Sequence, residues 1–256
     1  MSLYRYQVQE RFPAWGARGQ ARLARATAVV VGVGALGGNA AGLLARAGVG
    51  TLRLVDPDRP SLDNLHRQVL YDERDVARGR RKVGAAARRL LRANSGVRIQ
   101  AHATRLAPEN ALSLLAGAEV VLDGLDQSPA RYLLNEACLE LGIPWVHAGV
   151  VGDRGQLLVI RPGQGPCLRC WLPPPPPDKS QAQSVAVLGV LPPTPACLAS
   201  LQVMEALKIL LGEEEALLRG MLRVELWPPR FRLIRPRPDM SRDCPACRGE
   251  YRFLPV

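Results

Sequence analysis

A glycine-rich segment between two apolar runs, residues 26–56, constrains the fold of this chain more than any other stretch. Gly32, Gly34 and Gly37 follow the first run with the spacing GxGxxG, and small and apolar residues then continue at helical spacing. The second run ends in a carboxylate, Asp56. Glycines allow a tight turn and close approach of the backbone to phosphate, and a helix start offers unpaired N–H groups to an anion. This pattern predicts a nucleotide-binding βαβ unit, in which Asp56 accepts hydrogen bonds from ribose hydroxyls.

Strands and helices alternate along most of the remaining chain. Hydrophobic spacing predicts helices over residues 80–93, 108–116 and 129–141, and strands over 97–101, 119–122, 145–150 and 156–160. Alternating elements of this kind pack as a parallel sheet with helices on both faces. We therefore expect an α/β fold with a doubly wound, mostly parallel Rossmann-like sheet. Ligands of such sheets bind at the carboxyl ends of the strands.

The 256 residues are enough for one domain with a complete core. We expect an N-terminal helical arm over residues 1–25, a nucleotide-binding core over 26–160, a proline-rich crossover loop over 161–196, and a C-terminal part over 197–256. That last part should hold a helix over residues 197–211, a β hairpin and a zinc-bound tail. Apolar residues at helical spacing predict that the helix buries Leu198, Leu201, Met204 and Leu207.

The charge of the chain is strongly basic, at +11 with a pI near 10.0. The basic residues are scattered without an aromatic platform, which indicates a bias towards arginine rather than direct nucleic-acid binding. A partner with an acidic face fits this charge. The first residues contain no apolar stretch typical of a secretory signal, and glycines interrupt the apolar window 26–45. We expect a soluble, cytoplasmic protein without a membrane span.

Four of the six cysteines form two CxxC pairs, Cys167 with Cys170 and Cys244 with Cys247. Four thiolates suit tetrahedral Zn²⁺, and a site with four protein ligands has no open position, so we predict a structural zinc site. Two unrelated pairs, or one redox pair, are the alternatives. Cys138 lies on a predicted helix and is expected in the core, as is Cys197.

A second group of polar residues follows the glycine unit and includes Asp56, Asp58, Asn64, Arg67, Gln68 and Lys82. Arg67 and Lys82 supply the positive charge that a triphosphate site requires. Lys82 is notable because the chain contains only three lysines. Asp126, at the end of the fourth predicted strand, is a natural Mg²⁺ ligand, and Asp123 has an equal chemical claim. No role is assigned to the three histidines: His66, His102 and His147.

The order of these motifs resembles a known family. The segments that carry the resemblance are GVGALG, AGVGTLRLVDPD, SLDNLHRQ, VLDGLDQ, PCLRC, SLQVMEALKIL and CPAC, and they extend over nearly the whole chain. In them the chain resembles the bacterial E1-like adenylyltransferases of the ThiF/MoeB/HesA family, which activate ubiquitin-like sulfur carriers. The resemblance implies that residues 1–256 form a single E1-like adenylation domain.

The resemblance also implies a reaction that depends on ATP and Mg²⁺. The C-terminal glycine carboxylate of a small carrier ending in Gly-Gly attacks the α-phosphate, giving an acyl-adenylate and pyrophosphate. Arg67, Lys82 and Asp126 are the implied catalytic residues, with Mg²⁺ on Asp126. The implied ATP-binding residues are Gly32, Gly34, Gly37, Asp56, Asp58, Asn64, Arg67, Gln68, Lys82 and Asp126. A homodimer is expected, with a sulfurtransferase or cysteine desulfurase downstream, in thiamine, molybdopterin or tRNA-thiolation sulfur transfer.

Three positions depart from the family pattern. Val8 stands where members commonly place an arginine of the N-terminal arm, and Arg11 or Arg5 is a candidate substitute. Val185 stands where some members carry a reactive cysteine in the crossover loop, so we expect no enzyme-bound thioester. Gln127 replaces the usual Asn after the metal-binding Asp.

Two alternative functions come from other classes. The glycine unit alone also fits an NAD(P)-dependent oxidoreductase, although the set formed by Asn64, Arg67, Lys82 and Asp126 has no evident use in hydride transfer. The change at Val8 keeps open a non-catalytic scaffold that binds the carrier without activating it.

Overall fold

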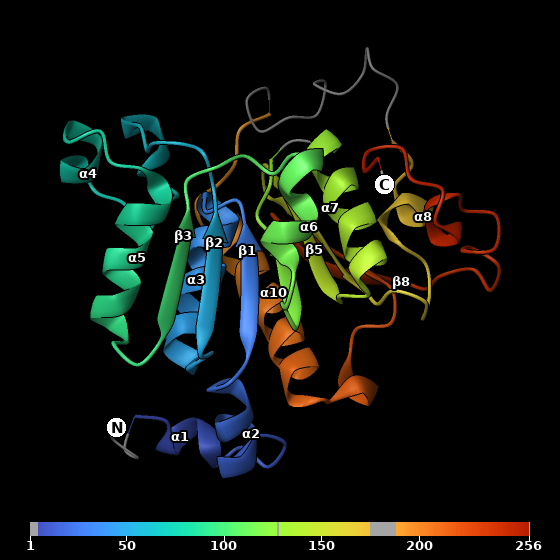
Figure 1. The fold of residues 1–256 in the computed structure, drawn as a ribbon, viewed down its shortest axis with the longest axis horizontal. Coiled ribbons are helices and arrows are strands. Elements are labelled where there is room, and N and C mark those ends of the chain that lie inside the picture. The colour runs from blue at the N-terminus through green and yellow to red at the C-terminus, as the bar shows by residue number, and fades with distance from the viewer. Residues whose placement is uncertain (1–4, 127, 175–187, 256) are drawn as a thin grey trace.

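The structure is a computed structural model that describes residues 5–126, 128–174 and 188–255. One eight-stranded sheet forms its centre, with the strand order β3-β2-β1-β4-β5-β6-β7-β8 (Figure 1). The strands are β1 (Thr27–Val31), β2 (Thr51–Val55), β3 (Arg98–His102), β4 (Val120–Asp123), β5 (Trp145–Val151), β6 (Arg154–Ile160), β7 (Met221–Leu226) and β8 (Pro229–Ile234). The first five in this order pair in parallel, and β6, β7 and β8 continue the sheet in antiparallel fashion.

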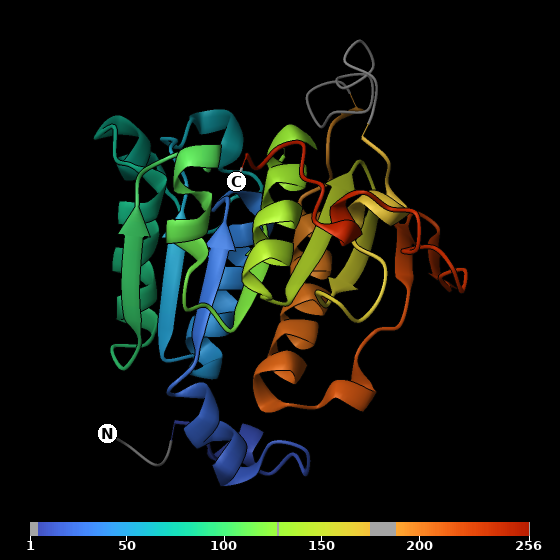
Figure 2. The same cartoon turned by 45° about the vertical axis from the view of Figure 1, so that its right-hand side comes forward.

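Helices cover both faces of the sheet. The longer helices are α2 (Gly16–Leu23), α3 (Ala35–Ala47), α5 (Lys82–Ala93), α6 (Pro108–Leu115), α7 (Ser128–Leu141) and α10 (Pro193–Leu211). The short ones are α1 (Gln7–Glu10), η1 (Leu62–Asn64), α4 (Glu73–Ala77), α8 (Leu168–Trp171), η3 (Glu214–Ala216) and η4 (Ala246–Arg248). Helices α3, α5 and α10 lie on one face, and α6 and α7 lie on the other (Figures 1 and 2).

The sequence of β1 shows why both faces are covered. Ala28 and Val30 point into the core formed with α3, α5 and α10, whereas Val29 and Val31 point into the core formed with α6 and α7. A strand buried on both sides reads as a continuous apolar run, because successive side chains point to opposite faces. The predicted α/β class, with a mostly parallel sheet and a C-terminal hairpin, is confirmed.

The change from parallel to antiparallel pairing follows from the length of one connection. Only Gly152 and Asp153 separate β5 from β6, and Gly152 has a φ of 59°. Two residues are enough for a hairpin but not for a parallel crossover. The strand β6 must therefore return beside β5, and the hairpin β7–β8 extends this edge.

Helix α10 departs from the sequence-based expectation in two ways. It begins at Pro193 rather than at residue 197. Met204, predicted to be buried, is 54% exposed, so that prediction was wrong. The rest of the predicted stripe does face the core: Leu198 and Leu207 are buried, and Leu201 is half-buried against it. Val203 and Ala206 complete this face, which packs on α3 and β5, and Met204 lies outside it.

Helix α10 is, within the described residues, the one helix long and apolar enough to cross a membrane by length and composition. More than half of that segment is buried inside the protein, and it packs against α3 and the strands β5 and β6. These contacts explain its apolar composition as that of a core helix.

The N-terminal arm is less regular than expected. Its described part holds two short helices, α1 and α2, and Pro13 lies between them. Because proline removes a backbone donor and disrupts a continuing helix, one unbroken helix does not form here. The arm lies at the end of the sheet where the parallel strands begin (Figure 2).

Candidate functional site: a nucleotide-type cleft and a four-cysteine cluster

An open cleft of about 280 Å³ lies at the carboxyl ends of β1, β2 and β4. Such an edge is the usual ligand site of an open parallel sheet. The predicted site residues that line it are Gly32, Gly34, Asp56, Asp58, Arg67, Gln68, Lys82 and Asp126. Gly37 lies beneath the cleft rather than in its wall. Asn64 does not line it, and its amide donates to the Asp63 carboxylate at 3.2 Å.

The glycine turn brings the backbone to the cleft. Gly32 has a φ of 85°, which favours glycine, and a Cβ atom on Gly37 would lie 1.8 Å from the Gly32 carbonyl oxygen. Gly34 caps α3 without a side-chain hydrogen bond. The first N–H groups of α3 therefore face the cleft without a capping side chain, and a helix start of this kind suits a phosphate.

Gly124 is a site residue that the sequence analysis missed. It lines the cleft directly after β4, and a Cβ atom on it would lie 2.2 Å from the Gly32 carbonyl oxygen. Its N–H donates to the carbonyl of Val31 at 2.8 Å. The turn after β1 and the loop after β4 therefore pack backbone to backbone. A glycine directly after a buried strand was the available local signal.

Asp56 lies at the inner end of the cleft and is buried. Its carboxylate accepts the N–H groups of Val33 at 2.7 Å and of Asp58 at 2.8 Å. Burial raises the pKa of Asp56, and the nearby Lys82 charge opposes this shift. Each carboxylate oxygen can accept a further hydrogen bond, as ribose recognition requires. The side-chain oxygen of Gln68, a buried residue of the cleft wall, has no hydrogen-bond partner among the described residues.

Lys82 is the most constrained cation of the cleft. It is the first residue of α5 and only 7% exposed, and its backbone N–H donates to the Asp58 carbonyl at 2.9 Å. Its ammonium lies 3.4 Å from the Asp58 carboxylate, which is itself exposed. A buried ammonium with one weak partner has donors left for phosphate oxygens. The guanidinium of Arg67 donates a hydrogen bond to the Asp63 carbonyl at 2.8 Å.

The structure distinguishes Asp123 from Asp126 as candidate ligands for a cation. Asp123 is fully buried, and both of its carboxylate oxygens accept hydrogen bonds from protein groups. Asp126 is exposed and lines the cleft. A carboxylate open to the cleft is the one that can bind a cation together with phosphate oxygens.

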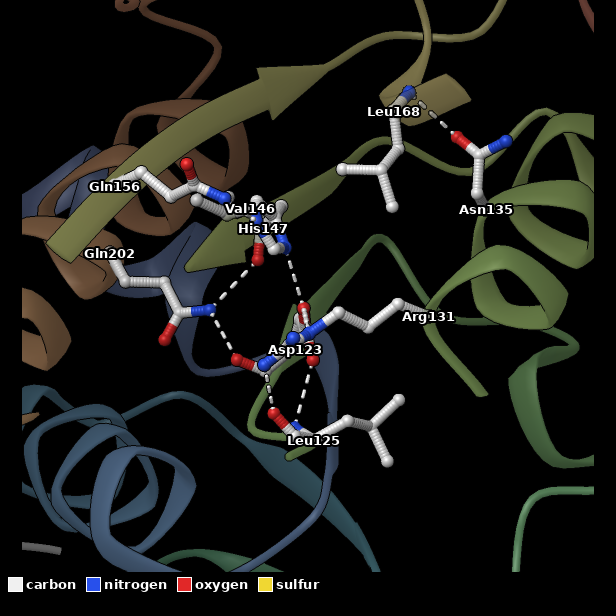
Figure 3. A network of polar contacts seen from close by, with 9 residues as sticks. All are labelled: Asp123, Leu125, Arg131, Asn135, Val146, His147, Gln156, Leu168 and Gln202. Atoms are coloured by element: carbon white, nitrogen blue, oxygen red, sulfur yellow. Dashed lines mark hydrogen bonds and ion pairs between the residues drawn. The ribbon is translucent and has the colours of Figure 1, made fainter. Parts of the chain in front are cut away.

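A buried polar network lies behind this loop and was not predicted from the sequence (Figure 3). It joins Asp123 to His147 and Arg131, and the side chain of Gln202 bridges the backbones of β4 and β5. Arg131 also lines the cleft. His147 and Gln202 had no local signal, since each depends on partners far along the chain.

The four cysteines of the two CxxC pairs come together as predicted. All four sulfur atoms lie within 4.8 Å of one another, with Cys167 Sγ 3.8 Å from Cys244 Sγ and Cys170 Sγ 3.5 Å from Cys247 Sγ. None forms a disulfide. Thiol hydrogen bonds from Cys167 and Cys170 hold the pKa of Cys247 well below its usual range, while hydrogen bonds with Cys167 and Cys247, together with burial, raise the pKa of Cys170. A dication removes this conflict because it binds every sulfur as thiolate. The cluster therefore fits Zn²⁺.

Helix α7 connects the cysteine cluster to the cleft. Its first turn carries the cleft-lining Arg131, and Asn135 accepts the N–H of Leu168 at 3.0 Å, beside the first CxxC pair (Figure 3). Glu136, buried in the same helix, accepts backbone N–H groups of residues 252–254 at 2.6 to 3.1 Å. The tail that holds the second CxxC pair is thereby fixed against α7.

Comparison with known proteins agrees with this geometry. A model of the ThiF family matches residues 6–246. The sulfur carrier protein adenylyltransferase of Thermus thermophilus is 40% identical over 97% of this chain and 92% of the relative. The adenylyltransferase and sulfurtransferase MOCS3 of Mus musculus is 42% identical, and this chain spans 52% of its length.

Solved structures share the fold at lower identity. The crystal structure of E. coli MccB with ATP is 22% identical, with a TM-score of 0.74 over 91% of this chain and 72% of that one. At that identity the likeness concerns the fold alone. The family model and the Thermus relative extend over nearly the whole chain, and on that ground this chain belongs to the ThiF family.

Proposed function

We propose that this chain adenylates the C-terminal glycine carboxylate of a ubiquitin-like sulfur-carrier protein, with ATP and Mg²⁺ as co-substrate and cofactor and with release of pyrophosphate. The observation that carries the proposal is the convergence of Lys82, Arg67 and Asp126 on one cleft beside the open start of α3. These groups come from three separate elements, and together they match what a triphosphate and its cation require. The names of the Thermus and MOCS3 relatives support the same activity.

The mechanism follows from charge and position. The attacking carboxylate is already ionised at neutral pH, so the reaction needs no general base. Its difficulty is that two anions must approach, and Lys82, Arg67 and the N–H groups of α3 offset this repulsion. Mg²⁺ on Asp126 would add positive charge to the phosphates. Asp56 would hold the ribose and so fix the α-phosphate for attack.

Zinc in the four-cysteine cluster would have a structural role. Cys167, Cys170, Cys244 and Cys247 provide a complete tetrahedral set, which leaves no position for water or substrate. The bound metal would fix the C-terminal tail on α7. It would thereby also hold the first turn of that helix in place beside the cleft.

The N-terminal arm supports a homodimer. The arm lies at the end of the sheet where the parallel strands begin (Figure 2), and the cleft lies at their carboxyl ends, so an arm arginine would reach a cleft in another copy. Val8 on α1 is 80% exposed and Phe12, just after that helix, is 61% exposed, so the arm presents two apolar side chains that a partner copy could cover. Arg5 donates to the Ala93 carbonyl at 2.9 Å of its own chain, so of the two candidate substitutes Arg11 is the better placed.

We place the enzyme in the cytoplasm, where ATP is available, with a sulfurtransferase or cysteine desulfurase acting on the adenylated carrier. The position of Val185, which underlies the expectation that no enzyme-bound thioester forms, lies outside the described residues.

An ATP–pyrophosphate exchange assay tests the proposal. Exchange should require a carrier ending in Gly-Gly and should fall by at least about 100-fold in Asp126→Asn, as expected when a cation ligand is lost. Glu109→Gln is the matched control, since Glu109 is an exposed carboxylate on α6 outside the cleft. Tight carrier binding without exchange would instead support the scaffold function.

A further inference from the structure

His147 is a buried histidine that lies beside the cleft without lining it. It is on β5, only 1% exposed, and absent from the cleft wall. Its Nδ1 lies 2.7 Å from an Asp123 carboxylate oxygen, and its Nε2 lies 3.3 Å from the side-chain nitrogen of Gln156. The carboxylate requires a proton on Nδ1, which leaves Nε2 free to accept from the Gln156 amide. One neutral tautomer therefore satisfies both neighbours.

The electrostatics agree with a neutral ring. Burial lowers the pKa of His147, and the Arg131 charge acts in the same direction, against the opposing effect of Asp123. The Asp123 charge is already offset by Arg131, whose Nε lies 3.1 Å from the same carboxylate oxygen. A second positive charge would leave this buried group with an unpaired cation, which is costly. The ring therefore acts as a hydrogen-bond donor rather than as an ion.

Asp123 transmits this constraint to the cleft. Its other carboxylate oxygen accepts the N–H of Leu125 at 2.8 Å, which fixes the turn at residues 123–125 directly after β4. The Asp123 carbonyl accepts a hydrogen bond from the Gln202 amide at 2.9 Å, and the N–H of the next residue, Gly124, donates to the last carbonyl of β1. Asp126 follows Leu125 directly, and Arg131, in the first turn of α7, contacts Asp123 (Figure 3).

We propose that His147 is a positioning residue. Through Asp123 it orients two groups toward the nucleotide and its cation: Asp126, which follows β4, and the Arg131 side chain of α7. The inference rests on the proposed function for the reaction that it affects. Residues that orient a metal ligand from behind commonly change metal affinity or activity by about 10- to 100-fold when they are lost.

Two substitutions of similar size separate positioning from plain packing. The amide nitrogen of asparagine is the same number of bonds from Cα as Nδ1, so His147→Asn keeps the donor to Asp123. The amide of glutamine corresponds to Nε2, so His147→Gln keeps the contact with Gln156 and loses the donor to Asp123. Both remove the ring, and the shorter asparagine leaves the larger packing defect at this buried site, so packing alone predicts the greater loss in His147→Asn.

The measurement is carrier-dependent exchange as a function of Mg²⁺, with thermal unfolding in parallel. In His147→Gln we expect the half-maximal Mg²⁺ concentration to rise about tenfold and kcat to fall about tenfold, while the KM for the carrier stays unchanged. His147→Asn should remain within about threefold of the unmodified protein. Equal losses in both variants, following the unfolding temperature, would overturn the proposal, as would unchanged Mg²⁺ dependence in His147→Gln.

A second readout does not depend on turnover. Calorimetric binding of Mg²⁺·ATP should weaken in His147→Gln relative to His147→Asn, and nitrogen NMR of the unmodified protein should show the Nδ1-protonated ring near neutral pH. A protonated or Nε2–H ring would contradict the assignment. If the unmodified protein binds Mg²⁺·ATP but shows no exchange with any carrier, the proposed function fails, while the binding comparison still decides the role of His147.

Discussion

A Cβ atom placed on Gly37 would lie 1.8 Å from the carbonyl oxygen of Gly32, so the first turn of α3 rests directly on the glycine turn. We expect Gly37→Ala to push these backbones apart, to lower the melting temperature and to abolish ATP binding. Gly42→Ala is the matched control in the same helix, because nothing lies within 4 Å of its added Cβ. It should stabilise the protein by about 0.5–1 kcal/mol, the helix preference for alanine.

Thermal unfolding and ATP-binding calorimetry on these two variants are sufficient. Unchanged ATP affinity in Gly37→Ala would show that the turn can relax, and would remove the close-approach explanation of the motif.

Because of Asp56, ATP binding should weaken on acidification at a higher pH than the usual titration range of aspartate. Burial raises its pKa, so on acidification the folded protein takes up this proton above the ordinary midpoint of about 4. The protonated group is a weaker acceptor for the Val33 and Asp58 N–H groups and for the ribose, so affinity should fall. Because the folded-state pKa is the higher one, protonation stabilises the fold, and that contribution is lost as the pH rises through the folded pKa.

Protonation of Asp56 should therefore weaken ATP binding but should not destabilise the folded protein. Calorimetric titrations from neutral to mildly acidic pH, compared with Asp56→Asn, isolate this effect from the titration of ATP itself. Parallel pH curves for the two proteins would contradict the assignment.

The cysteine cluster predicts one zinc ion per chain by native mass spectrometry. Cys244→Ser should lose the metal and lower the unfolding temperature, since a structural zinc site contributes folding free energy directly. Cys197→Ser is the control, because Cys197 is a free cysteine outside the cluster. An apo protein with unchanged stability in Cys244→Ser would refute a structural metal.

Glu136 should control the order of the C-terminal tail. Glu136→Gln keeps the shape of the side chain but removes the charge that accepts the N–H groups of residues 252–254. We expect a loss of about 1–3 kcal/mol in the free energy of unfolding and faster hydrogen exchange of that segment. Glu109→Gln, on the neighbouring α6, should leave both unchanged. Normal protection of the tail in Glu136→Gln would show that the cysteine cluster alone fixes it.

Local sequence signals were sufficient to predict those parts of the site whose residues follow one another in a single stretch of the chain. The glycine turn with Asp56 could be predicted because strand, turn, helix and acid follow one another directly. The two CxxC pairs were equally readable, although they are distant in sequence, because a four-thiolate set has few other uses. The mostly parallel sheet followed from the alternation of elements.

The remaining features depend on tertiary contacts that no local pattern contains. His147 meets Asp123 24 residues away, and Gln202 meets it 79 residues away. Met204 has apolar character and helical spacing, yet the packing of α10 on α3 buries the neighbouring Val203 and Ala206 and leaves Met204 exposed. Periodicity shows that a helix has an apolar face, but the partner elements decide which residues that face includes.

The most direct test of the adenylation account is the mass of the carrier itself. After incubation with the enzyme and Mg²⁺·ATP, intact-mass spectrometry should show a carrier ending in Gly-Gly that has gained one AMP group, with equimolar pyrophosphate. The adduct should be absent with Asp126→Asn, and no carrier–enzyme species that a thiol reagent cleaves should form if Val185 excludes the thioester. A carrier that binds the enzyme but keeps its original mass would contradict the account.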